Sequence, residues 1–319
     1  MNKPKVSICV PTYGQTNYLY ETLKSIKSQD FMDYEIIISD DTPDMSVMEL
    51  VTSFGIDKRL RYYHNSEILG TPANWNAAVS RAKGAYIKIM HHDDRFIDNG
   101  SLKAFVELLD DNPDASIAFS ATKAESTMHG RGRFNRPSDN TVAEVRKNPC
   151  KLFFGNIIGA PSATIYRNGI NVEYNIALKW LVDVDFYIRV LLQNKNIAYT
   201  SRVLVCVTCN AKHQVTQSCN NNAVIDIGEH LYLYEKIKPM ICNEKNTRYC
   251  WFRLFEKYGV YSTRDLDRIG LDKLLNKLLL SVFFDDYHKI WLQRLPFRFY
   301  YSAPAPIRRM ITLLFSKFK

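Results

Sequence analysis

The sequence predicts an α/β protein: a mostly parallel, twisted sheet with helices on both faces, followed by a C-terminal helical extension. Two observations predict this fold class. Short apolar runs of strand length alternate with stretches in which apolar residues recur at helical spacing. From residue 222 onward, by contrast, the patterns are helical only.

The first part of the chain carries clear start and stop signals. Residues 6–10 form an apolar run that ends at Pro11, which predicts a buried strand followed by a turn. Thr71 and Pro72 suit the N-cap and the first position of a helix, and Gly84 suits its end. The elements expected here are, in order, strand 6–10, helix 19–26, strand 34–39, helix 45–54, strand 59–64, helix 73–83 and strand 86–90.

A second segment begins near Pro113, and a polar, arginine-rich stretch at 123–148 separates its first two strands. The elements expected here are strands 115–121 and 163–167, helix 183–193, strand 199–207, and helices 225–238, 246–258 and 271–284. We therefore expect an α/β domain at 1–219 and a helical extension at 220–319.

Composition excludes several classes of protein. The 319 residues are 46% hydrophobic and 24% charged, which is typical of a globular chain and excludes disorder, collagen and coiled coil. No apolar run reaches the roughly 18 residues that span a membrane, and the first residues lack the cleavage site of a secretory signal. Seven scattered cysteines fit reduced thiols in a cytoplasmic protein better than a disulfide framework.

The net charge of +9 is concentrated near the C-terminus. After Asp286 the chain contains lysines and arginines but no acidic residue, which argues against nucleic acid as the partner of the whole protein. Residues 307–318 place their apolar side chains on one helical face. This pattern fits either peripheral contact with an anionic membrane surface or a basic helix packed on its own domain.

Polar residues follow three of the expected strands. The three clusters are Pro11, Thr12 and Tyr13; Asp40 and Asp41; and His91, His92, Asp93 and Asp94. Ligands of open α/β sheets bind at the carboxyl ends of the strands, so the three clusters together predict one binding site. Turn-forming residues are the alternative interpretation, above all for Asp40 and Asp41.

No glycine-rich phosphate loop follows the first strand, since neither GxGxxG nor GxxxxGK[ST] occurs there. A nucleotide bound at this edge would therefore need another group to neutralise its phosphates. A divalent cation held by carboxylates bridges phosphate oxygens and stabilises a departing diphosphate. Asp93 and Asp94 supply the hard oxygen ligands that Mg²⁺ and Mn²⁺ take.

Four motifs, in order, resemble those of the family 2 glycosyltransferases, inverting enzymes of the GT-A fold that use nucleotide sugars. The motifs are VSICVPTYG at 6–14, YEIIISDDTPD at 34–44, GAYIKIMHHDDRF at 84–96 and LVDVDFYIR at 181–189. The resemblance covers about the first 215 residues. The chain is similar in particular to enzymes that build bacterial surface polysaccharides. It implies that 1–219 is the nucleotide-sugar-binding and catalytic domain.

The resemblance also implies roles for individual residues. Asp41 would hydrogen-bond the base, Asp93 would face the ribose and sugar, and Asp94 would ligate Mn²⁺ or Mg²⁺. Asp183 matches the catalytic base, which would take the proton of the acceptor hydroxyl as it attacks. The other residues expected to contact the nucleotide sugar are Pro11, Thr12, Tyr13, Asn74 and Asn76.

Two positions depart from the family pattern. His91 stands where the usual Asp-x-Asp motif has its first acid, and imidazole suits Mn²⁺ better than Mg²⁺. His91 either ligates the metal, contacts phosphate or only packs. Val182 replaces the common acidic neighbour of Asp183, and Asp185 is the reserve base. The plainer interpretation of both aspartates is that they stabilise a helix N-terminus.

Two further patterns lie after the last expected strand. The polar segment 210–222 resembles the loop that closes over the donor in this family, and its His213 is a possible loop contact with the diphosphate or the metal. A solvated histidine is the alternative. Cys206 and Cys209 form a single CxxC, which is weak support for zinc because strand positions i and i+3 face opposite ways.

The sequence thus favours a metal-dependent glycosyltransferase that moves a sugar from a nucleotide-diphosphate donor to an oligosaccharide or lipid-linked glycan acceptor. The expected setting is bacterial polysaccharide biosynthesis of the O-antigen or capsule type, in the cytoplasm or at the inner face of the membrane. The alternative is a catalytically impaired GT-A module that binds nucleotide or glycan, which the departure at His91 keeps open.

Overall fold

A computed structural model describes residues 3–55, 58–126, 132–211, 214–215, 219, 221–241, 244–271, 273–287 and 304. The chain divides into two compact units, Met1–Asn220 and Asn221–Lys319. That residues 1–219 form the catalytic domain and residues 220–319 an extension of it stays a prediction.

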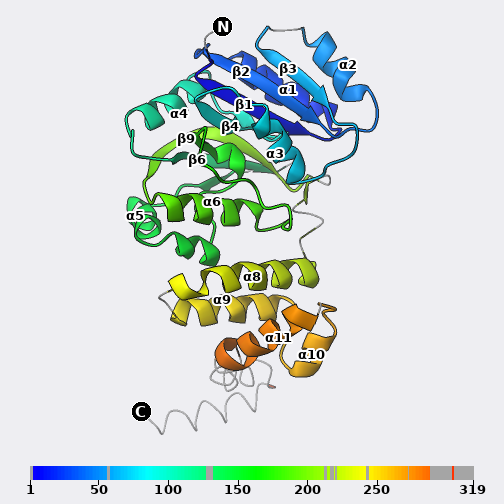
Figure 1. The fold of residues 1–319 in the computed structure, drawn as a ribbon, viewed down its shortest axis with the longest axis vertical. Helices are drawn as coiled ribbons and strands as arrows, with labels where there is room; N and C mark the ends of the chain where they lie inside the picture. The colour runs from blue at the N-terminus through cyan, green and yellow to red at the C-terminus, as the bar shows by residue number, and fades with distance from the viewer. Residues whose placement is uncertain are drawn as a thin grey trace. The chain divides into compact units, whose positions relative to one another are not determined.

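The first unit alternates strands and helices along the chain, as Figure 1 shows. Its strands are β1 (Val6–Thr12), β2 (Tyr34–Asp40), β3 (Leu60–His64), β4 (Tyr86–Ile89), β5 (Arg95–Phe96), β6 (Ile117–Ser126), β7 (Arg133–Asn135), β8 (Thr164–Arg167) and β9 (Ile197–Cys209). Its helices are α1 (Thr16–Lys27), α2 (Ser46–Ser53), α3 (Ala73–Ser80), α4 (Ser101–Asp110), α5 (Asp139–Lys147) and α6 (Val182–Gln193), with 3₁₀ turns at Pro149–Phe154 and Pro161–Ala163.

The strands form one mixed sheet in the order β3-β2-β1-β4-β8-β6-β9-β5, with β7 paired to β6. Strands β3, β2, β1 and β4 run parallel, whereas β8 is antiparallel to both of its neighbours and β5 is antiparallel to β9. The predicted α/β class with a mostly parallel sheet is confirmed, because β6 and β9 also pair parallel and run in the direction of β4, so that only β5, β7 and β8 run against the other strands. Strand direction depends on long-range pairing, which the apolar pattern of a single strand does not encode.

Both faces of the sheet are covered at β1. Alternate residues of a strand point to opposite faces, so a strand covered on both faces buries every residue. All seven residues of β1 are buried. Val6, Ile8 and Val10 share a core cluster with apolar residues of α1, α2 and α4. On the opposite face, the Cys9 thiol donates to the carbonyl oxygen of Ala78 in α3 at 3.6 Å. A central strand buried on both faces explains the continuous apolar run in the sequence.

Helix α3 begins at the expected residue, but its end and its N-cap differ from the expectation. It spans Ala73–Ser80, with Pro72 rather than Thr71 at the N-cap, and no side chain caps it. The amide of Asn74 donates to the carbonyl of Gly70 at 2.8 Å, so the turn before the helix takes up the residues expected as its start. Helix α4 was not expected, although its buried Leu102, Phe105, Val106 and Leu109 recur at helical spacing.

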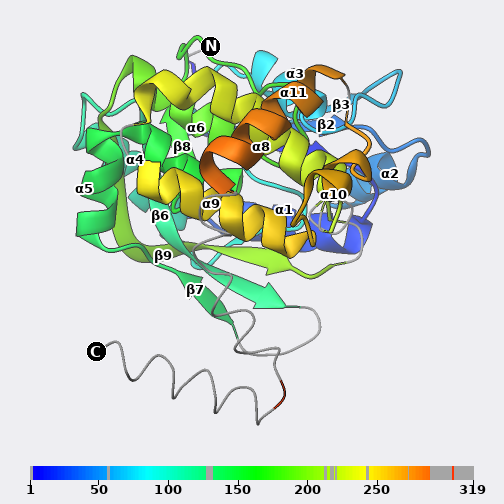
Figure 2. The same cartoon turned by 90° about the horizontal axis from the view of Figure 1, so that it is seen from below.

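The second unit is helical, as predicted, with α8 (Ala223–Ile237), α9 (Glu244–Lys257), α10 (Thr263–Asp267), α11 (Lys273–Val282) and a π turn at Phe283–Tyr287. Trp251 of α9 is buried and its ring packs against Tyr234 of α8. Asp226 of α8 accepts hydrogen bonds from Lys257 Nζ and Tyr258 Oη, both at 2.7 Å. A buried carboxylate thus joins α8 to the end of α9. Figure 2 shows these helices from below.

Among the described residues, no helix combines the length and the apolar character that crossing a membrane requires. The basic segment that was predicted to contact a membrane, after Asp286, lies almost entirely outside the described residues. Its membrane contact therefore stays a prediction.

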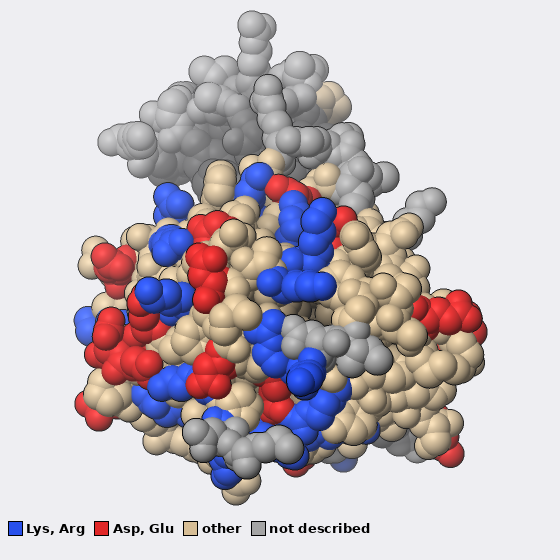
Figure 3. Space-filling view, turned by 90° about the horizontal axis from the view of Figure 1, so that it is seen from above, with Lys and Arg blue, Asp and Glu red and all other residues tan. Residues whose placement is uncertain are grey.

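Charged side chains of both signs share the face shown in Figure 3, where Lys and Arg gather along the middle with Asp and Glu beside them. Ion pairs among the described residues include Lys5 Nζ–Asp110 Oδ1 at 2.7 Å and Arg202 Nη2–Asp98 Oδ2 at 2.9 Å. Exposed pairs of this kind contribute only about 0–1 kcal/mol, so the fold depends on its apolar core rather than on these charges.

The core prediction concerns Leu23, a fully buried residue of α1. Leu23→Ala is expected to lower the free energy of unfolding by about 2–5 kcal/mol, because it removes buried methyl groups and leaves a cavity. Glu21→Ala, at an exposed position of the same helix, is the control and is expected to change it by no more than about 0.5 kcal/mol. Urea denaturation followed by circular dichroism measures both. Equal midpoints for the two variants would contradict this account of the core.

Candidate active site

The carboxyl ends of β1, β2 and β4 lie side by side at one edge of the sheet. Thr12 at the end of β1 is in register with Asp40 of β2, and Cys9 is in register with Ile89 of β4. Residues 91–94 therefore leave the sheet next to the end of β1. The three clusters that the sequence placed after strands meet at this edge, as the strand-end argument predicts.

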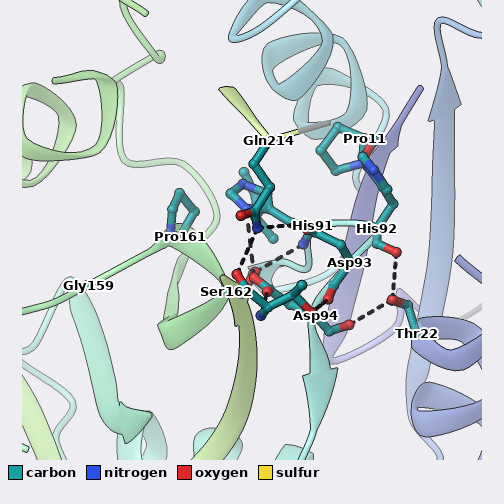
Figure 4. Close-up of polar contacts among 12 residues, drawn as sticks. Pro11, Thr22, His91, His92, Asp93, Asp94, Gly159, Pro161, Ser162 and Gln214 are labelled. Carbon is teal, nitrogen blue, oxygen red and sulfur yellow. Dashed lines mark hydrogen bonds and ion pairs between the residues drawn. The ribbon is translucent and has the colours of Figure 1, made fainter. Parts of the chain in front are cut away.

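His91, Asp93 and Asp94 form a cluster that we call the acidic site (Figure 4). Within the described ranges it is the one group of three or more potential metal-ligating side chains, and its ligand atoms lie within 4.8 Å of one another. Asp94 is 1% exposed, and its Oδ1 accepts from the amide of Thr208 at 3.0 Å. Its Oδ2 has no hydrogen-bond partner among the described residues and lies 3.8 Å from His91 Nδ1. A buried carboxylate oxygen in this state is costly unless a cation approaches it.

Burial controls the charge of the acidic site. Burial, and then the negative charge of Asp93, raise the pKa of the Asp94 carboxyl to about 8. Burial lowers the pKa of the His91 imidazole to about 4, so the ring is neutral near neutral pH. A divalent cation would favour the ionised form of Asp94. A neutral imidazole beside two carboxyl groups is a donor set that suits Mn²⁺, so these residues fit the expected ion.

Polar groups from α1 and from the 3₁₀ turn Pro161–Ala163 hold the backbone of the acidic site. Thr22 Oγ1 of α1 lies 2.8 Å from His92 O and 2.7 Å from Asp94 O. Ser162 Oγ accepts from the amide of His91 at 3.0 Å. Figure 4 shows both residues beside the acidic site. The turn that carries the ligands is thus fixed from two sides.

A fully buried lysine stands behind the acidic site. Lys88 of β4 donates from Nζ to the carbonyl oxygen of Ser162, and its ammonium lies 4.6 Å from the centre of the Phe105 ring. Burial lowers the pKa of Lys88 to about 7, while the charge of Asp94 acts in the opposite direction. Lys88 therefore supplies positive charge behind the carboxylates without reaching the solvent.

Gln214 approaches the acidic site from the polar segment after β9. Its Nε2 donates to Asp93 Oδ2 at 2.9 Å and to Thr208 O at 2.7 Å, and its Oε1 accepts from the amide of Ala211 at 3.2 Å. This segment does contact the site, but through Gln214. His213 lies outside the described residues, so its contact with diphosphate or metal stays a prediction.

Asp41 and Asn74 belong to one buried hydrogen-bond network. Asp41 accepts from Asn65 Nδ2 and from the amide of Gly70, both at 2.8 Å. Asn74 Nδ2 donates to Ser39 O at 3.0 Å, and its Oδ1 accepts from Asn65 Nδ2 at 3.1 Å. Both residues lie at the predicted edge and fix the loop before α3. Their contact with a base or sugar stays a prediction.

The other residues expected at the donor differ in exposure. Pro11 and Thr12 are buried at the end of β1, whereas Tyr13 is 53% exposed. Asn76 pairs with the backbone of Tyr174, donating to its carbonyl at 2.8 Å and accepting from its amide at 2.9 Å. Tyr13 is therefore the most accessible of these side chains, and Asn76 ties α3 to the segment before α6.

The two candidate bases lie in the first turn of α6 and have different surroundings. Asp183 Oδ2 accepts from Asn156 Nδ2 at 2.7 Å, and its Oδ1 accepts from the amide of Val184 at 2.9 Å. Asp185 is buried and forms an ion pair with Arg189 of the same helix at 2.6 Å. Asp185 is thus the less accessible of the two carboxylates, and which of them acts as the base stays a prediction.

Sequence reasoning missed Thr22, Lys88, Asn156, Ser162 and Gln214. A lysine inside an apolar strand run was a signal for Lys88, because a buried charge needs a partner. The other four are common polar residues in helices, turns and loops, and their contacts are long-range. Their sequence separations from the site give no pattern to find.

The weak zinc interpretation finds no support among the described residues. Cys206 is buried on β9 and Cys209 is partly exposed at its end. Within the part of the chain that is described, neither cysteine belongs to a group with metal-ligand spacing.

Solved structures with the same architecture define the class of protein. The computed structure is similar to Staphylococcus aureus TarS 1–349 in complex with UDP-GlcNAc, with a TM-score of 0.61 and 18% identity over 98% of this chain and 88% of that one. It is also similar to the mannosyltransferase PcManGT of Pyrobaculum calidifontis in complex with GDP-Man and Mn²⁺, with a TM-score of 0.59 and 15% identity over 91% and 84% of the two chains. The fold is thus of the GT-A type.

The family follows from the sequence comparison. A model described as glycosyl transferase family 2 matches residues 7–172, so the chain belongs to this family of transferases. The recognition of the family from its motifs is confirmed.

The curated relatives of the chain include proteins named for glycan biosynthesis. It is 34% identical over 195 residues, 60% of this chain and 68% of the relative, to the putative colanic acid biosynthesis glycosyl transferase WcaA of Escherichia coli. It is 32% identical over 106 residues, 33% and 34% of the two chains, to the GalNAc(5)-diNAcBac-PP-undecaprenol β-1,3-glucosyltransferase of Campylobacter jejuni. A Mycobacterium tuberculosis protein is 28% identical over 207 residues, and the chain spans 63% of its length.

The acidic site yields a prediction about metal binding. Asp94→Asn is expected to weaken Mn²⁺ binding by more than the roughly 10–100-fold that loss of a second-shell partner costs, because a ligand itself is lost. Isothermal titration with MnCl₂, alone and with UDP or GDP, measures this. Asp111→Asn, at an exposed position after α4, is the control and should bind as the wild type does. Unchanged affinity in Asp94→Asn would place the ion elsewhere.

Proposed function

We propose that the protein is an inverting, metal-dependent glycosyltransferase that transfers a sugar from a nucleotide-diphosphate donor to an oligosaccharide or lipid-linked glycan. One observation carries the proposal: the ligand atoms of His91, Asp93 and Asp94 gather within 4.8 Å at the carboxyl ends of parallel strands. A site of this kind can neutralise a diphosphate where the chain has no glycine-rich loop.

Asp94 and His91 would hold Mn²⁺ or Mg²⁺, and Asp93 would face the ribose and sugar. When bound, the ion supplies charge neutralisation for the diphosphate of the donor. The ammonium form of the buried Lys88, whose pKa burial lowers to about 7, adds positive charge behind the carboxylates. PcManGT, named as a complex with GDP-Man and Mn²⁺, supports the choice of ion and of donor class. TarS, named as a complex with UDP-GlcNAc, supports a nucleotide sugar without fixing which one.

Asp183 would act as the general base. The acceptor hydroxyl must lose its proton as it attacks, because a neutral alcohol is a weak nucleophile. The acceptor oxygen forms a bond to the anomeric carbon, and the bond from that carbon to the diphosphate oxygen breaks. Its electron pair leaves with the nucleoside diphosphate, and the proton passes to the Asp183 carboxylate. In-line attack of this kind inverts the anomeric configuration.

The names of two relatives support the proposed acceptor and the proposed biological setting. The Campylobacter jejuni relative is named for an undecaprenol-linked acceptor, and WcaA is named for colanic acid biosynthesis. These names support a bacterial surface polysaccharide of the O-antigen or capsule type. A lipid-linked acceptor would place the reaction at the cytoplasmic face of the membrane, where the basic C-terminal segment is suited to peripheral contact.

Turnover of nucleotide sugars tests the proposal. We expect release of UDP or GDP from one member of a donor panel, dependent on Mn²⁺ or Mg²⁺. Asp183→Asn is expected to lower kcat by about 10²–10⁴-fold, because it removes the general base while keeping the shape of the side chain. NMR of the product would show an anomeric configuration opposite to that of the donor.

The matched control is Asp139→Asn, which changes an exposed aspartate in the first turn of α5 and should retain wild-type kcat. Full activity of Asp183→Asn would reject its role as base. Binding of nucleotide without turnover of any donor would instead favour the impaired GT-A module.

A further inference from the structure

We propose that Asn156 is a positioning residue for the base: its side-chain amide orients the Asp183 carboxylate and keeps it ionised. The inference rests on the proposed function, in which Asp183 takes the acceptor proton. The Asn156 side chain donates from Nδ2 to Asp183 Oδ2 at 2.7 Å. This contact joins two segments 27 residues apart in the sequence.

Both ends of the Asn156 amide are engaged, which fixes its orientation. Its Oδ1 accepts from the amides of Ile158 at 3.1 Å and Gly159 at 2.9 Å. Because the oxygen is taken by two donors, the Nδ2 end must face Asp183 and the carbonyl of Gly159, which it reaches at 3.1 Å. The amide therefore cannot flip without losing several hydrogen bonds.

The turn that carries Asn156 is itself held in place. Tyr187 of α6 donates from Oη to Gly159 O at 3.1 Å, so the helix of the base binds the same turn. Gly159 has φ +94°, in the left-handed region that favours glycine, and a Cβ there would lie 3.1 Å from Asn135 Nδ2. The position of Asn156 is thus set by the backbone of its loop and by α6 together.

The same loop continues to the acidic site. Three residues after Gly159, Ser162 accepts from the amide of His91, and its carbonyl oxygen accepts from buried Lys88. Figure 4 shows Gly159, Pro161 and Ser162 on this path. One short loop therefore contacts the residue proposed as base at Asn156 and the residues proposed to hold the metal at Ser162.

Hydrogen-bond chemistry sets the direction in which the pKa of Asp183 changes when the Asn156 donor is removed. A donor to a carboxylate stabilises its ionised form and lowers its pKa, so removing the donor raises the pKa. A second carboxyl group at the same place raises it further, because two like charges at this distance resist ionising together. A base with a raised pKa is protonated over a wider pH range, so the acid limb of the kcat profile moves to higher pH.

Asn156→Asp separates this role from a merely structural one. The new carboxylate still accepts from the amides of Ile158 and Gly159, which hold the turn, but the donor to Asp183 and to the Gly159 carbonyl is lost. We expect the acid limb of the kcat–pH profile to move to higher pH by at least about one unit. The value of kcat at its optimum should fall about tenfold, and the KM of the donor should stay unchanged. Asn112→Asp, at an exposed position after α4, adds the same charge and should behave as the wild type does.

A second readout does not depend on turnover. In protein labelled with ¹³C at the aspartate carboxyl groups, the Asp183 signal is identified by its loss in Asp183→Asn. Its titration midpoint should rise by at least about one pH unit in Asn156→Asp. A wild-type midpoint and a wild-type kcat profile in Asn156→Asp would overturn the inference and leave Asn156 as a turn residue only. A shifted midpoint in a protein that turns over no donor would support the contact while rejecting the proposed function.

Discussion

The burial of the Asp94 carboxyl group is the constraint on which the rest of the site depends. This carboxyl is 1% exposed, and one of its oxygens has no hydrogen-bond partner among the described residues. Burial and the neighbouring Asp93 raise the pKa of Asp94 to about 8, even though the charge of Lys88 acts in the opposite direction. Lys88 supplies part of the compensation from behind, and an ion between Asp94 and His91 would supply the remainder. The neutral imidazole at His91 is consistent with a ligand rather than with a second acid.

In the proposed mechanism, the groups that neutralise the leaving group and activate the acceptor belong to different elements. The acidic site follows β4, and Asp183 lies in the first turn of α6. The loop from Asn156 to Ser162 contacts both, through hydrogen bonds to Asp183 and to the amide of His91. One short loop thus connects the two groups, which matters because proton transfer and bond cleavage must occur in one geometry.

The sequence predicted the fold class and the strand-end residues because both follow from local patterns. The apolar run of β1 and the aspartates after β4 are visible within a few positions. Strand direction at β8 was not predictable, since it depends on pairing with β4 and β6. The role of Asn156 was equally hidden, because a contact over 27 residues leaves no mark in local spacing. Asp185 shows the same limit: its ion pair with Arg189 distinguishes it from Asp183 only in three dimensions.

Anomalous diffraction from crystals grown with Mn²⁺ and a nucleoside diphosphate tests the central claim most directly. The account predicts a manganese peak within coordination distance of an Asp94 carboxylate oxygen and the ring of His91, with the diphosphate on its open side. A peak bound to other residues, or a bound diphosphate with no metal at Asp94, would contradict it.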